Sequence, residues 1–266
     1  MHDRRCFGCV AFILIAILTH EPASSQTNTP WLYIGEYSEY DLSYFGIPAS
    51  KICFHLADTL HLDSTAAFKL NVTTQTTGVW SGLFRLDNIY ESTIDLNTDL
   101  PIAYYKRINQ KNIQQEWTLR FDQMNHVASI DAEKSWSIPP NCHNFFSMIY
   151  AIRRSNFAIT DTLQFHLDVE SLIWEVRMVK RGIESIDVPA GNFEAVKFEV
   201  DFIPLKKGSK RAWKTDLLTN RLARENSSGA MWFSNDEYKT LLKIHYKQSI
   251  NSLKVQLRGV HPSKQN

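Results

Sequence analysis

Histidine and acidic residues at short spacing are the first groups in this 266-residue sequence that could do chemistry. If residues 54–63 are extended, His55, His61 and Asp63 lie on one face of the strand. Imidazole and carboxylate groups together form a ligand set for zinc and other transition metals. Such spacing arises readily by chance, and no second group of ligands accompanies it. We therefore expect an exposed polar strand face and no metal.

Three acidic residues four positions apart form a second group. Asp87, Glu91 and Asp95 could include a general acid and a general base. Acidic residues are also ordinary on a solvent-facing strand, and the sequence has no nucleophile elbow, phosphate-binding loop or HExxH helix. We expect no catalytic residues and no cofactor, and an enzyme stays open as an alternative.

Two of the four cysteines, Cys53 and Cys142, lie outside the N-terminal apolar segment. In an oxidising compartment they could form a disulfide that constrains the unfolded chain. They could equally be two separate thiols, because a free cysteine packs as a small apolar side chain. The sequence does not give the Cα separation on which a disulfide depends, so both alternatives stay open.

The most strongly charged segment spans residues 206–224. Asp216 is its one acidic residue, and its basic residues are Lys206, Lys207, Lys210, Arg211, Lys214, Arg221 and Arg224. In helical form Trp213 would belong to an apolar stripe. Lys210, Arg211 and Lys214 would lie beside that stripe, where they could contact anionic lipid headgroups or acidic polysaccharide. We favour the simpler alternative, a solvated crossover that covers an open sheet edge.

Strand patterns account for most of the remaining chain. After the turn residues Pro189 and Gly191, the apolar residues Val196, Phe198, Val200 and Phe202 alternate with charged ones, as in a half-buried strand. Similar runs separated by Gly and Asn predict successive antiparallel strands. We expect a mainly β fold in which an antiparallel meander forms a strongly curved sheet or incomplete barrel.

One segment departs from the strand pattern. Residues 142–154 read CHNFFSMIYAIRR, with either Asn141 or Asn144 available as N-cap and with Arg153 and Arg154 at the C-terminal end. Its apolar positions are Phe146, Met148, Ile149 and Ile152. We expect one short amphipathic helix near residues 142–153 that closes one side or mouth of the sheet.

The N-terminus predicts export. Residues 6–18 form an apolar run that is shorter than the ~20 residues of a membrane-spanning helix. It follows Arg4 and Arg5, and small residues at Ala23 and Ser25 suit a signal peptidase. We expect a signal peptide over residues 1–25, cleaved after Ser25, and a single β-rich domain over residues 26–266. The net charge of +1 indicates no nucleic-acid partner.

Five segments resemble a bacterial family known as domain of unknown function 3108. In chain order they are GEYSEYDLSYFGIPAS, DNIYESTIDLNTDLPIAYYKRI, FFSMIYAIRR, VPAGNFEAVKFEV and MWFSNDEYKTLLKI. The resemblance covers residues 35–260, and the VPAGNF turn and the Trp-x-Ser-x-Asp segment are its most specific parts. It implies an exported, mostly β protein of the Gram-negative envelope and no established activity.

Two classes of function follow from these observations. We favour a non-catalytic periplasmic protein whose concave, aromatic-lined face holds an apolar or amphipathic ligand such as a lipid. Arg153 and Arg154 would then lie at the cavity mouth and pair with a phosphate or carboxylate, unless they merely cap the helix and face water. The alternative is an enzyme that modifies an envelope glycan or lipid, or a structural or assembly factor. Lipid, acidic glycan and a peripheral membrane surface are the expected partners, and the oligomeric state is open.

Overall fold

A computed structural model describes residues 32–62, 65–77, 85–130, 134–206, 216, 218–219, 228–248 and 251–261. The predicted signal peptide and its cleavage site after Ser25 lie outside these residues, and so does Asp63. Trp213, Lys210, Arg211 and Lys214 of the basic segment also lie outside them, so the predictions for these residues stay predictions. Within the described part of the chain, no helix combines the length and the apolar character needed to span a bilayer.

The described residues form one large sheet and one helix. The strands are β1 (Tyr37–Tyr44), β2 (Ile47–Leu62), β3 (Thr65–Thr76), β4 (Asp87–Asp95), β5 (Pro101–Gln110), β6 (Ile113–Asp122), β7 (Val127–Ser129), β8 (Ser135–Ser137), β9 (Cys142–His143), β10 (Thr162–Val169), β11 (Leu172–Val188), β12 (Gly191–Pro204), β13 (Ser228–Ser234), β14 (Leu241–Gln248) and β15 (Asn251–His261). Their spatial order is β8-β7-β6-β5-β4-β3-β2-β1-β15-β14-β13-β12-β11-β10-β9. Neighbours are antiparallel except for the short pair β9 and β10.

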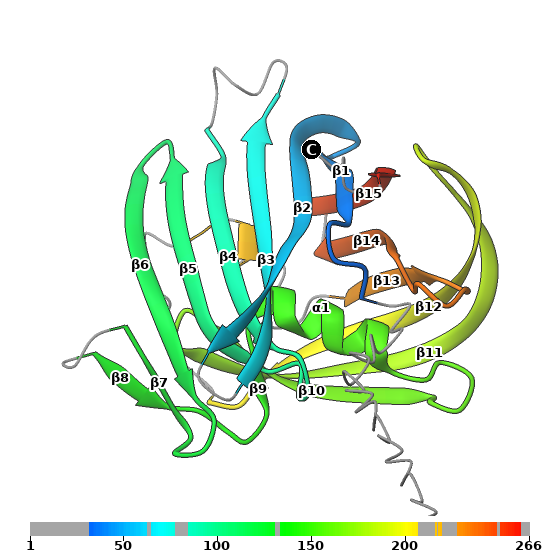
Figure 1. Ribbon diagram of the computed structural model, residues 1–266. Coiled ribbons are helices and arrows are strands. Elements are labelled where there is room, and N and C mark those ends of the chain that lie inside the picture. Colours follow the sequence, from blue (N-terminus) through cyan, green and yellow to red (C-terminus); the bar gives the residue numbers. More distant parts are fainter. Residues whose placement is uncertain are drawn as a thin grey trace, which may run out of the picture.

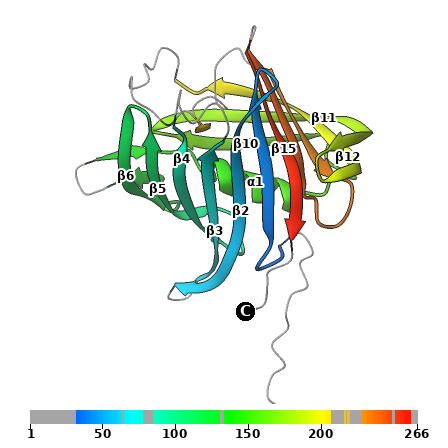
Figure 2. The ribbon, with the colours of Figure 1, turned by 90° about the horizontal axis from the view of Figure 1, so that it is seen from above.

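This order confirms the predicted curved antiparallel meander. Figure 1 and Figure 2 show the sheet wrapping around the helix α1 (Phe145–Arg154), which lies on its concave side. The order runs from β8 to β9 and these two end strands do not pair with each other, so the sheet is an incomplete barrel.

Period-two alternation determines which side of each strand faces α1. On β12 the side chains of Val196, Phe198, Val200 and Phe202 are at most 5% exposed, whereas Glu199 points to solvent. The strand β4 alternates buried and half-buried residues along its whole length. Because successive side chains point to opposite faces of a strand, this pattern places one apolar face of the sheet against the core.

The helix begins at Phe145, three residues later than predicted, because Cys142 and His143 pair with β10 as strand β9. Asn144 is the N-cap, and its side chain accepts hydrogen bonds from the backbone N–H groups of Phe146 and Ser147. Eight of the ten helical residues are buried. The helix therefore fills the concavity of the sheet instead of closing its mouth.

The VPAGNF segment forms the turn of the long hairpin β11–β12. Val188 pairs with Gly191, whose φ of 133° is a conformation that favours glycine. A bulge between Lys180 and Gly182 bends the hairpin. The backbone N–H of Ala190 in the turn then donates to the carbonyl of Leu257 on β15 at 3.0 Å. The motif is thus architectural, because it fixes the register of β12 and attaches the hairpin tip to the sheet.

The Trp-x-Ser-x-Asp segment forms the connection from β13 to β14. Asp236 accepts hydrogen bonds from the hydroxyl of Ser234 and from the backbone N–H groups of Tyr238 and Lys239. These contacts account for the Ser and the Asp as turn residues. The Trp, Trp232, lies on the outer face of the sheet, where its register partners are Lys197 and Lys243.

Candidate functional site

Lys106 is the centre of a polar cluster inside the curved sheet. It lies on the inner face of β5, in phase with Tyr104 and Ile108, and is only 1% exposed. Its Nζ is 3.1 Å from Oε1 of Glu170 and 3.2 Å from Oδ2 of Asp216. A buried ammonium group needs such partners because the loss of water is otherwise uncompensated.

Three aromatic rings surround the same ammonium group. The Nζ of Lys106 lies 5.0 Å from the ring centre of Trp117, 5.8 Å from that of Tyr104 and 5.9 Å from that of Tyr90. Rings at these distances attract a cation through their quadrupoles. Together with the two carboxylates they form a cation-binding cage, and the chain fills this cage with its own lysine.

Glu170 reaches the cage from the hairpin between β10 and β11. The two-residue turn consists of Glu170 and Ser171, with φ values of 55° and 65°. Both residues carry a Cβ, so the left-handed conformation costs on the order of 1 kcal/mol for each. Two contacts of the Glu170 carboxylate offset this strain. It pairs with the ammonium group of Lys106, and it accepts a hydrogen bond from the backbone N–H of Asp216 at 3.2 Å.

Asp216 reaches the cage from the crossover between β12 and β13 and is fully buried. Its carboxylate accepts hydrogen bonds from the Tyr90 hydroxyl at 3.0 Å, from Gln110 Nε2 at 3.1 Å and from the Thr219 hydroxyl at 2.8 Å. Burial alone would raise the pKa of Asp216, but the charge of Lys106 and the hydrogen bonds from the Thr219 hydroxyl and the Leu218 backbone N–H lower it below the usual value. The carboxylate is therefore ionised and tied to Lys106.

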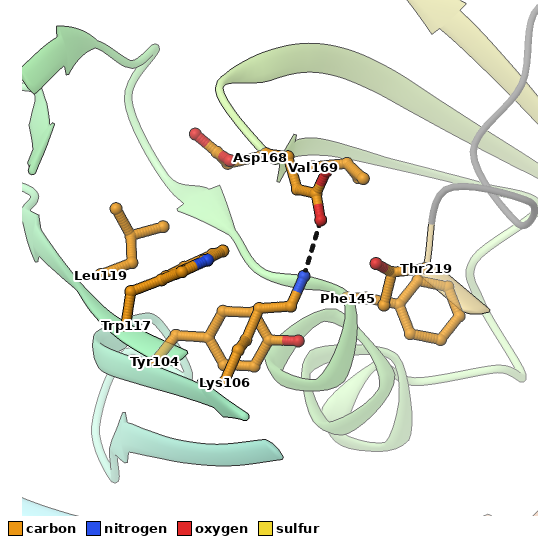
Figure 3. Close-up of a pocket in the computed structure, with 9 residues that line it drawn as sticks. Tyr104, Lys106, Trp117, Leu119, Phe145, Asp168, Val169 and Thr219 are labelled. Atoms are coloured by element: carbon orange, nitrogen blue, oxygen red, sulfur yellow. Dashed lines mark hydrogen bonds and ion pairs between the residues drawn. The ribbon is translucent and has the colours of Figure 1, made fainter. Parts of the chain in front are cut away.

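A small cavity of about 10 Å³ adjoins the cage, between α1 and the strands β5, β6 and β10 (Figure 3). Its lining residues are Tyr104, Lys106, Trp117, Leu119, Phe145, Asp168, Val169, Glu170 and Thr219. The hydroxyl of Tyr104 is buried and has no hydrogen-bond partner among the described residues. The space is close to the minimum for a single water molecule, which would satisfy this phenol.

Asp168 gives the cavity a group that titrates close to neutrality. Burial raises the pKa of Asp168 to about 6, although hydrogen bonds from the Trp136 indole and the Ser171 backbone N–H and the charge of Lys106 oppose this shift. The indole Nε1 of Trp136 on β8 donates to Oδ2 of Asp168 on β10 at 2.5 Å. This bond crosses the seam between the two ends of the open sheet. Because burial also raises the pKa of Tyr104, that residue remains a neutral phenol.

Within the described residues, this cavity between helix and sheet has a volume that suits a water molecule rather than an acyl chain. The reason lies in the packing of Phe146 on α1, whose ring contacts those of Phe54, Tyr90 and Tyr104 at centre distances of 5.7, 5.2 and 6.1 Å. Side chains of the helix therefore occupy the place that the prediction assigned to a ligand.

Arg153 does not lie at a ligand mouth, which corrects the prediction made for it. It is 2% exposed, and its Nη1 and Nη2 bind Oε1 and Oε2 of Glu36 at 3.0 and 2.7 Å. Its Nε donates to the carbonyl of Tyr238 at 3.1 Å. This bidentate pair joins the end of α1 to the residue that precedes β1, so the guanidinium is already occupied.

Arg154 is half-exposed but is also engaged within the chain. Its Nη1 donates to the carbonyl of Asn97 at 2.6 Å and to Oδ2 of Asp99 at 3.1 Å, in the turn between β4 and β5. Burial raises the pKa of Asp99, and the charge of Arg154 opposes this rise. Arg154 therefore fixes the helix end to this turn.

The two cysteines are free thiols in the structure, which corrects the candidate disulfide between Cys53 and Cys142. Cys53 is half-buried on β2, where its neighbours Ile52 and Phe54 point into the core and Cys53 points to the opposite face. Cys142 is buried on β9, and burial raises the pKa of its thiol. The two residues thus lie on strands that are not neighbours in the sheet.

The other residues singled out in the sequence do not converge. In the part of the chain that the structure describes, no group of His, Cys, Asp or Glu could hold a metal ion. Asp87 pairs with Arg85 at 3.1 Å and Glu91 pairs with Lys69 at 2.8 Å. Asp95 accepts from backbone N–H groups in the following turn. These acidic residues therefore serve the outer face of the sheet and its connections.

The cage was not predicted from the sequence, although two residues of the sequence indicate it. Lys106 stands at an inward position of the alternation that includes Tyr104 and Ile108, where a charged residue is unusual. Asp216 is the single acidic residue of the basic segment. Neither signal identifies the partner, because Lys106 and Asp216 are separated by 110 positions in the sequence.

Comparisons with known proteins identify relatives of unknown function. A family model described as a protein of unknown function, DUF3108, matches residues 39–258. No curated protein matches the sequence. A crystal structure of a β-barrel-like DUF1849 protein from Brucella abortus superposes with a TM-score of 0.57 at 6% identity, over 86% of this chain and 98% of that one. This likeness shows that the two proteins share a fold.

Two further solved structures superpose with lower scores. A protein from Bacteroides fragilis, provisionally described as exported and with a YmcC-like fold, has a TM-score of 0.36 at 8% identity over 85% of this chain and 95% of its own. A protein from Parabacteroides distasonis, provisionally described as a lipoprotein, has a TM-score of 0.39 at 10% identity over 87% and 97%.

Proposed function

The chain belongs to the DUF3108 family of proteins of unknown function, and we propose that it is an exported, non-catalytic protein of the Gram-negative cell envelope. In this proposal the mature chain resides in the periplasm and acts as a binding or assembly module. The N-terminal pattern of residues 1–25 supports export, because it combines basic residues, a short apolar run and a cleavage site.

The observation that carries the non-catalytic proposal is the pairing of the buried charged groups. The cation of Lys106 is held by Glu170 and Asp216, and that of Arg153 by Glu36. A catalytic acid, base or nucleophile must reach a substrate atom. These groups instead hold a hairpin, a crossover and a helix end in place, which is the behaviour of a rigid scaffold.

Within the part of the chain that the structure describes, the size of the cavity beside Lys106 supports contact at the surface over enclosure of a lipid. Pockets for small molecules measure roughly 300 to 1,000 Å³, whereas the cavity beside Lys106 measures about 10 Å³. We therefore propose that the partner is an amphipathic or acidic envelope molecule, such as a lipid headgroup or an acidic glycan. The protein meets this partner with its outer face, and peripheral contact with a membrane belongs to the same proposal.

Native mass spectrometry of the mature protein, released from its own envelope under gentle conditions, tests this proposal. We expect the mass of the polypeptide without a stoichiometric acyl-chain ligand. Recovery of one lipid per chain would contradict the surface mode and favour an enclosed lipid.

A second measurement addresses catalysis. The protein is incubated with isolated envelope glycan and lipid, and the products are followed by liquid chromatography with mass spectrometry. Asp168→Asn removes the carboxyl that titrates closest to neutrality and serves as the comparison variant. We expect identical product profiles for the wild type, the variant and a sample without protein. A product that only the wild type forms would establish an enzyme.

A further inference from the structure

Three lysines gather on the outer face of the sheet around Trp232. Lys197 on β12 and Lys243 on β14 are the register partners of Trp232 on β13. Their Nζ atoms lie 5.3 and 4.7 Å from the centre of the indole. Lys254 on β15 is the register partner of His245 on β14. His245 is two residues from Lys243 and therefore lies on the same face of β14. We refer to Lys197, Lys243 and Lys254 as the lysine cluster.

The lysine cluster contains more positive than negative charge. Its nearest carboxylate is that of Glu184, which lies 3.8 Å from Lys197 and accepts the indole N–H of Trp232 at 2.6 Å. Within the described residues, Lys243 and Lys254 form no ion pair. In this described part of the sheet, the ammonium groups of Lys243 and Lys254 therefore have no carboxylate partner.

Three other outward cations of this sheet each lie close to a carboxylate. Lys69 lies 2.8 Å from Glu91, Arg181 lies 2.6 Å from Glu199, and Arg258 lies 2.9 Å from Asp41. Outward cations without a carboxylate partner among the described residues also occur elsewhere, at Lys51, Arg107, Arg120 and Arg177, but the lysine cluster brings its cations together on β12, β14 and β15.

The packing of Trp232 holds the lysine cluster in place. The indole is 5% exposed because the two lysine stems lie beside it, and cation–π attraction favours this arrangement. Burial and the charges of Lys254 and Lys197 lower the pKa of Lys243, and the charge of Glu184 opposes this effect. An anion close to Lys243 would relieve this repulsion between like charges. Because the ammonium groups are already positioned, an incoming anion orders few side chains.

We propose that the lysine cluster is a binding site for an acidic glycan of the envelope, whose carboxylate or phosphate groups pair with Lys197, Lys243 and Lys254. This inference rests on the proposed function, in which the protein contacts its partner with its outer face. It specifies the class of the partner and the location of the binding site. Neighbouring strands are about 4.8 Å apart, so the backbones at Lys197 and Lys243 are about 10 Å apart across β13. This separation suits successive charges of an extended polymer that crosses the strands.

The surroundings of the lysine cluster favour a glycan over a bilayer. A protein surface that settles on a membrane buries exposed apolar or aromatic side chains beneath its cations. The aromatic residue of this site, Trp232, is instead shielded by the two lysine stems and cannot insert. The lysine cluster therefore offers charge without an apolar anchor, which fits a hydrated polyanion.

Lysine footprinting of the unmodified mature protein tests the site without a variant. The protein is acetylated for short times with alginate, with neutral dextran or with phosphatidylglycerol vesicles, and the modified lysines are identified by mass spectrometry. We expect alginate to slow acetylation of Lys243 and Lys254 at least fivefold and to leave Lys69 unchanged. Equal rates with and without alginate would overturn the proposal, as would protection by vesicles alone.

A pair of variants measures the energetic role of the site. Lys243→Gln combined with Lys254→Gln should weaken alginate binding at least tenfold, with a smaller dependence on salt, because two of the pairing charges are lost. Lys69→Gln removes an outward lysine that already has a partner and should bind alginate as the wild type does. Equal losses in the two variants would overturn the site. A stoichiometric lipid in native mass spectrometry would overturn the surface mode separately, since the footprint on the lysine cluster is measured independently.

Discussion

Lys106 shows how a single side chain joins three distant parts of this chain. Its ammonium group contacts Glu170 of the β10–β11 hairpin and Asp216 of the crossover, and it lies on β5 itself. Burying three charges does not by itself guarantee stability, because the loss of hydration opposes the attraction. Each partner nevertheless restricts the others to one position. We therefore interpret the cage as a device that fixes the hairpin and the crossover over the concave face.

Replacing Lys106 by Met should destabilise the protein strongly. The variant removes the cation that pairs with the buried carboxylate of Asp216 and the half-buried carboxylate of Glu170, and loss of one partner of a buried pair costs roughly 3 to 5 kcal/mol. Urea unfolding measures the difference.

Two further variants show whether charge is the cause. Arg258→Met removes a cation whose side chain is 50% exposed in its pair with Asp41, and it should cost less than about 1 kcal/mol. Adding Asp216→Asn to Lys106→Met should recover part of the loss, since one unpaired carboxylate disappears. An additive double variant would contradict the electrostatic account.

Asp168 should make part of the stability depend on pH. Its pKa is raised to about 6 by burial, opposed by Trp136, Ser171 and Lys106, whereas an unfolded aspartate titrates near about 3.9. The folded chain binds this proton more tightly, so the stabilisation is complete below about pH 4 and is lost as the pH rises through about 6. Relative to Asp168→Asn, which cannot titrate, the wild type should therefore gain about 2 kcal/mol between pH 7.5 and pH 4.

Urea unfolding of both proteins at the two pH values checks this result. The comparison with Asp168→Asn cancels the pH dependence that both proteins share, and the charge of Glu170, which also faces Asp168, is present in both. A difference between the two proteins that does not change with pH would show that the carboxyl is already neutral or is solvated.

Among the elements, the strands could be predicted from the sequence and the cage could not. Period-two alternation reports a local property, namely which side of a strand is apolar, so the faces of β12 and the sheet class follow from it. Asn144 was one of two predicted N-caps, but the helix start was placed too early because the pairing of Cys142 with β10 is a long-range event. The partners of Lys106 and Arg153 likewise depend on how the sheet curls, which no local pattern contains.

The inner face of β12 offers a direct test of the strand assignment. Phe198 is fully buried and its ring contacts Phe157 and Phe233 at centre distances of 5.1 and 6.3 Å. Phe198→Ala should destabilise by roughly 3 to 5 kcal/mol, because it removes apolar contacts and leaves a cavity. Glu199→Ala, at the next and outward-facing position, should cost less than about 1 kcal/mol. Comparable losses in urea unfolding would mean that the two faces are reversed.

At the scale of the whole molecule, the proposed export can be checked on the mature chain. The protein recovered from the periplasm should begin at Gln26 or within a few residues of it, because Ala23 and Ser25 supply the small side chains before the cut. N-terminal mass analysis measures this. A chain that retains Met1 would contradict both the compartment and the proposed function.

The open sheet also predicts where the molecule should open first. The end strands β8 and β9 do not pair with each other, and the side-chain bond from Trp136 to Asp168 joins β8 to β10 across the seam. Trp136→Phe keeps an aromatic ring and removes the N–H donor, and a hydrogen bond to a charged group contributes about 1.5 to 3 kcal/mol. We expect amide hydrogen exchange in β7, β8 and β9 to accelerate about tenfold or more in this variant.

The strands in the middle of the sheet provide the internal control for this experiment. β2 and β3 are paired on both sides over most of their length, so their opening requires the loss of many ladder hydrogen bonds. Their exchange should stay slow and should differ little between the wild type and Trp136→Phe. If β2 and β3 accelerated together with β7 and β8, the seam would belong to the same cooperative unit as the rest of the sheet. The incomplete barrel would then open only as a whole, and its two ends could not act as a separate, locally opening edge.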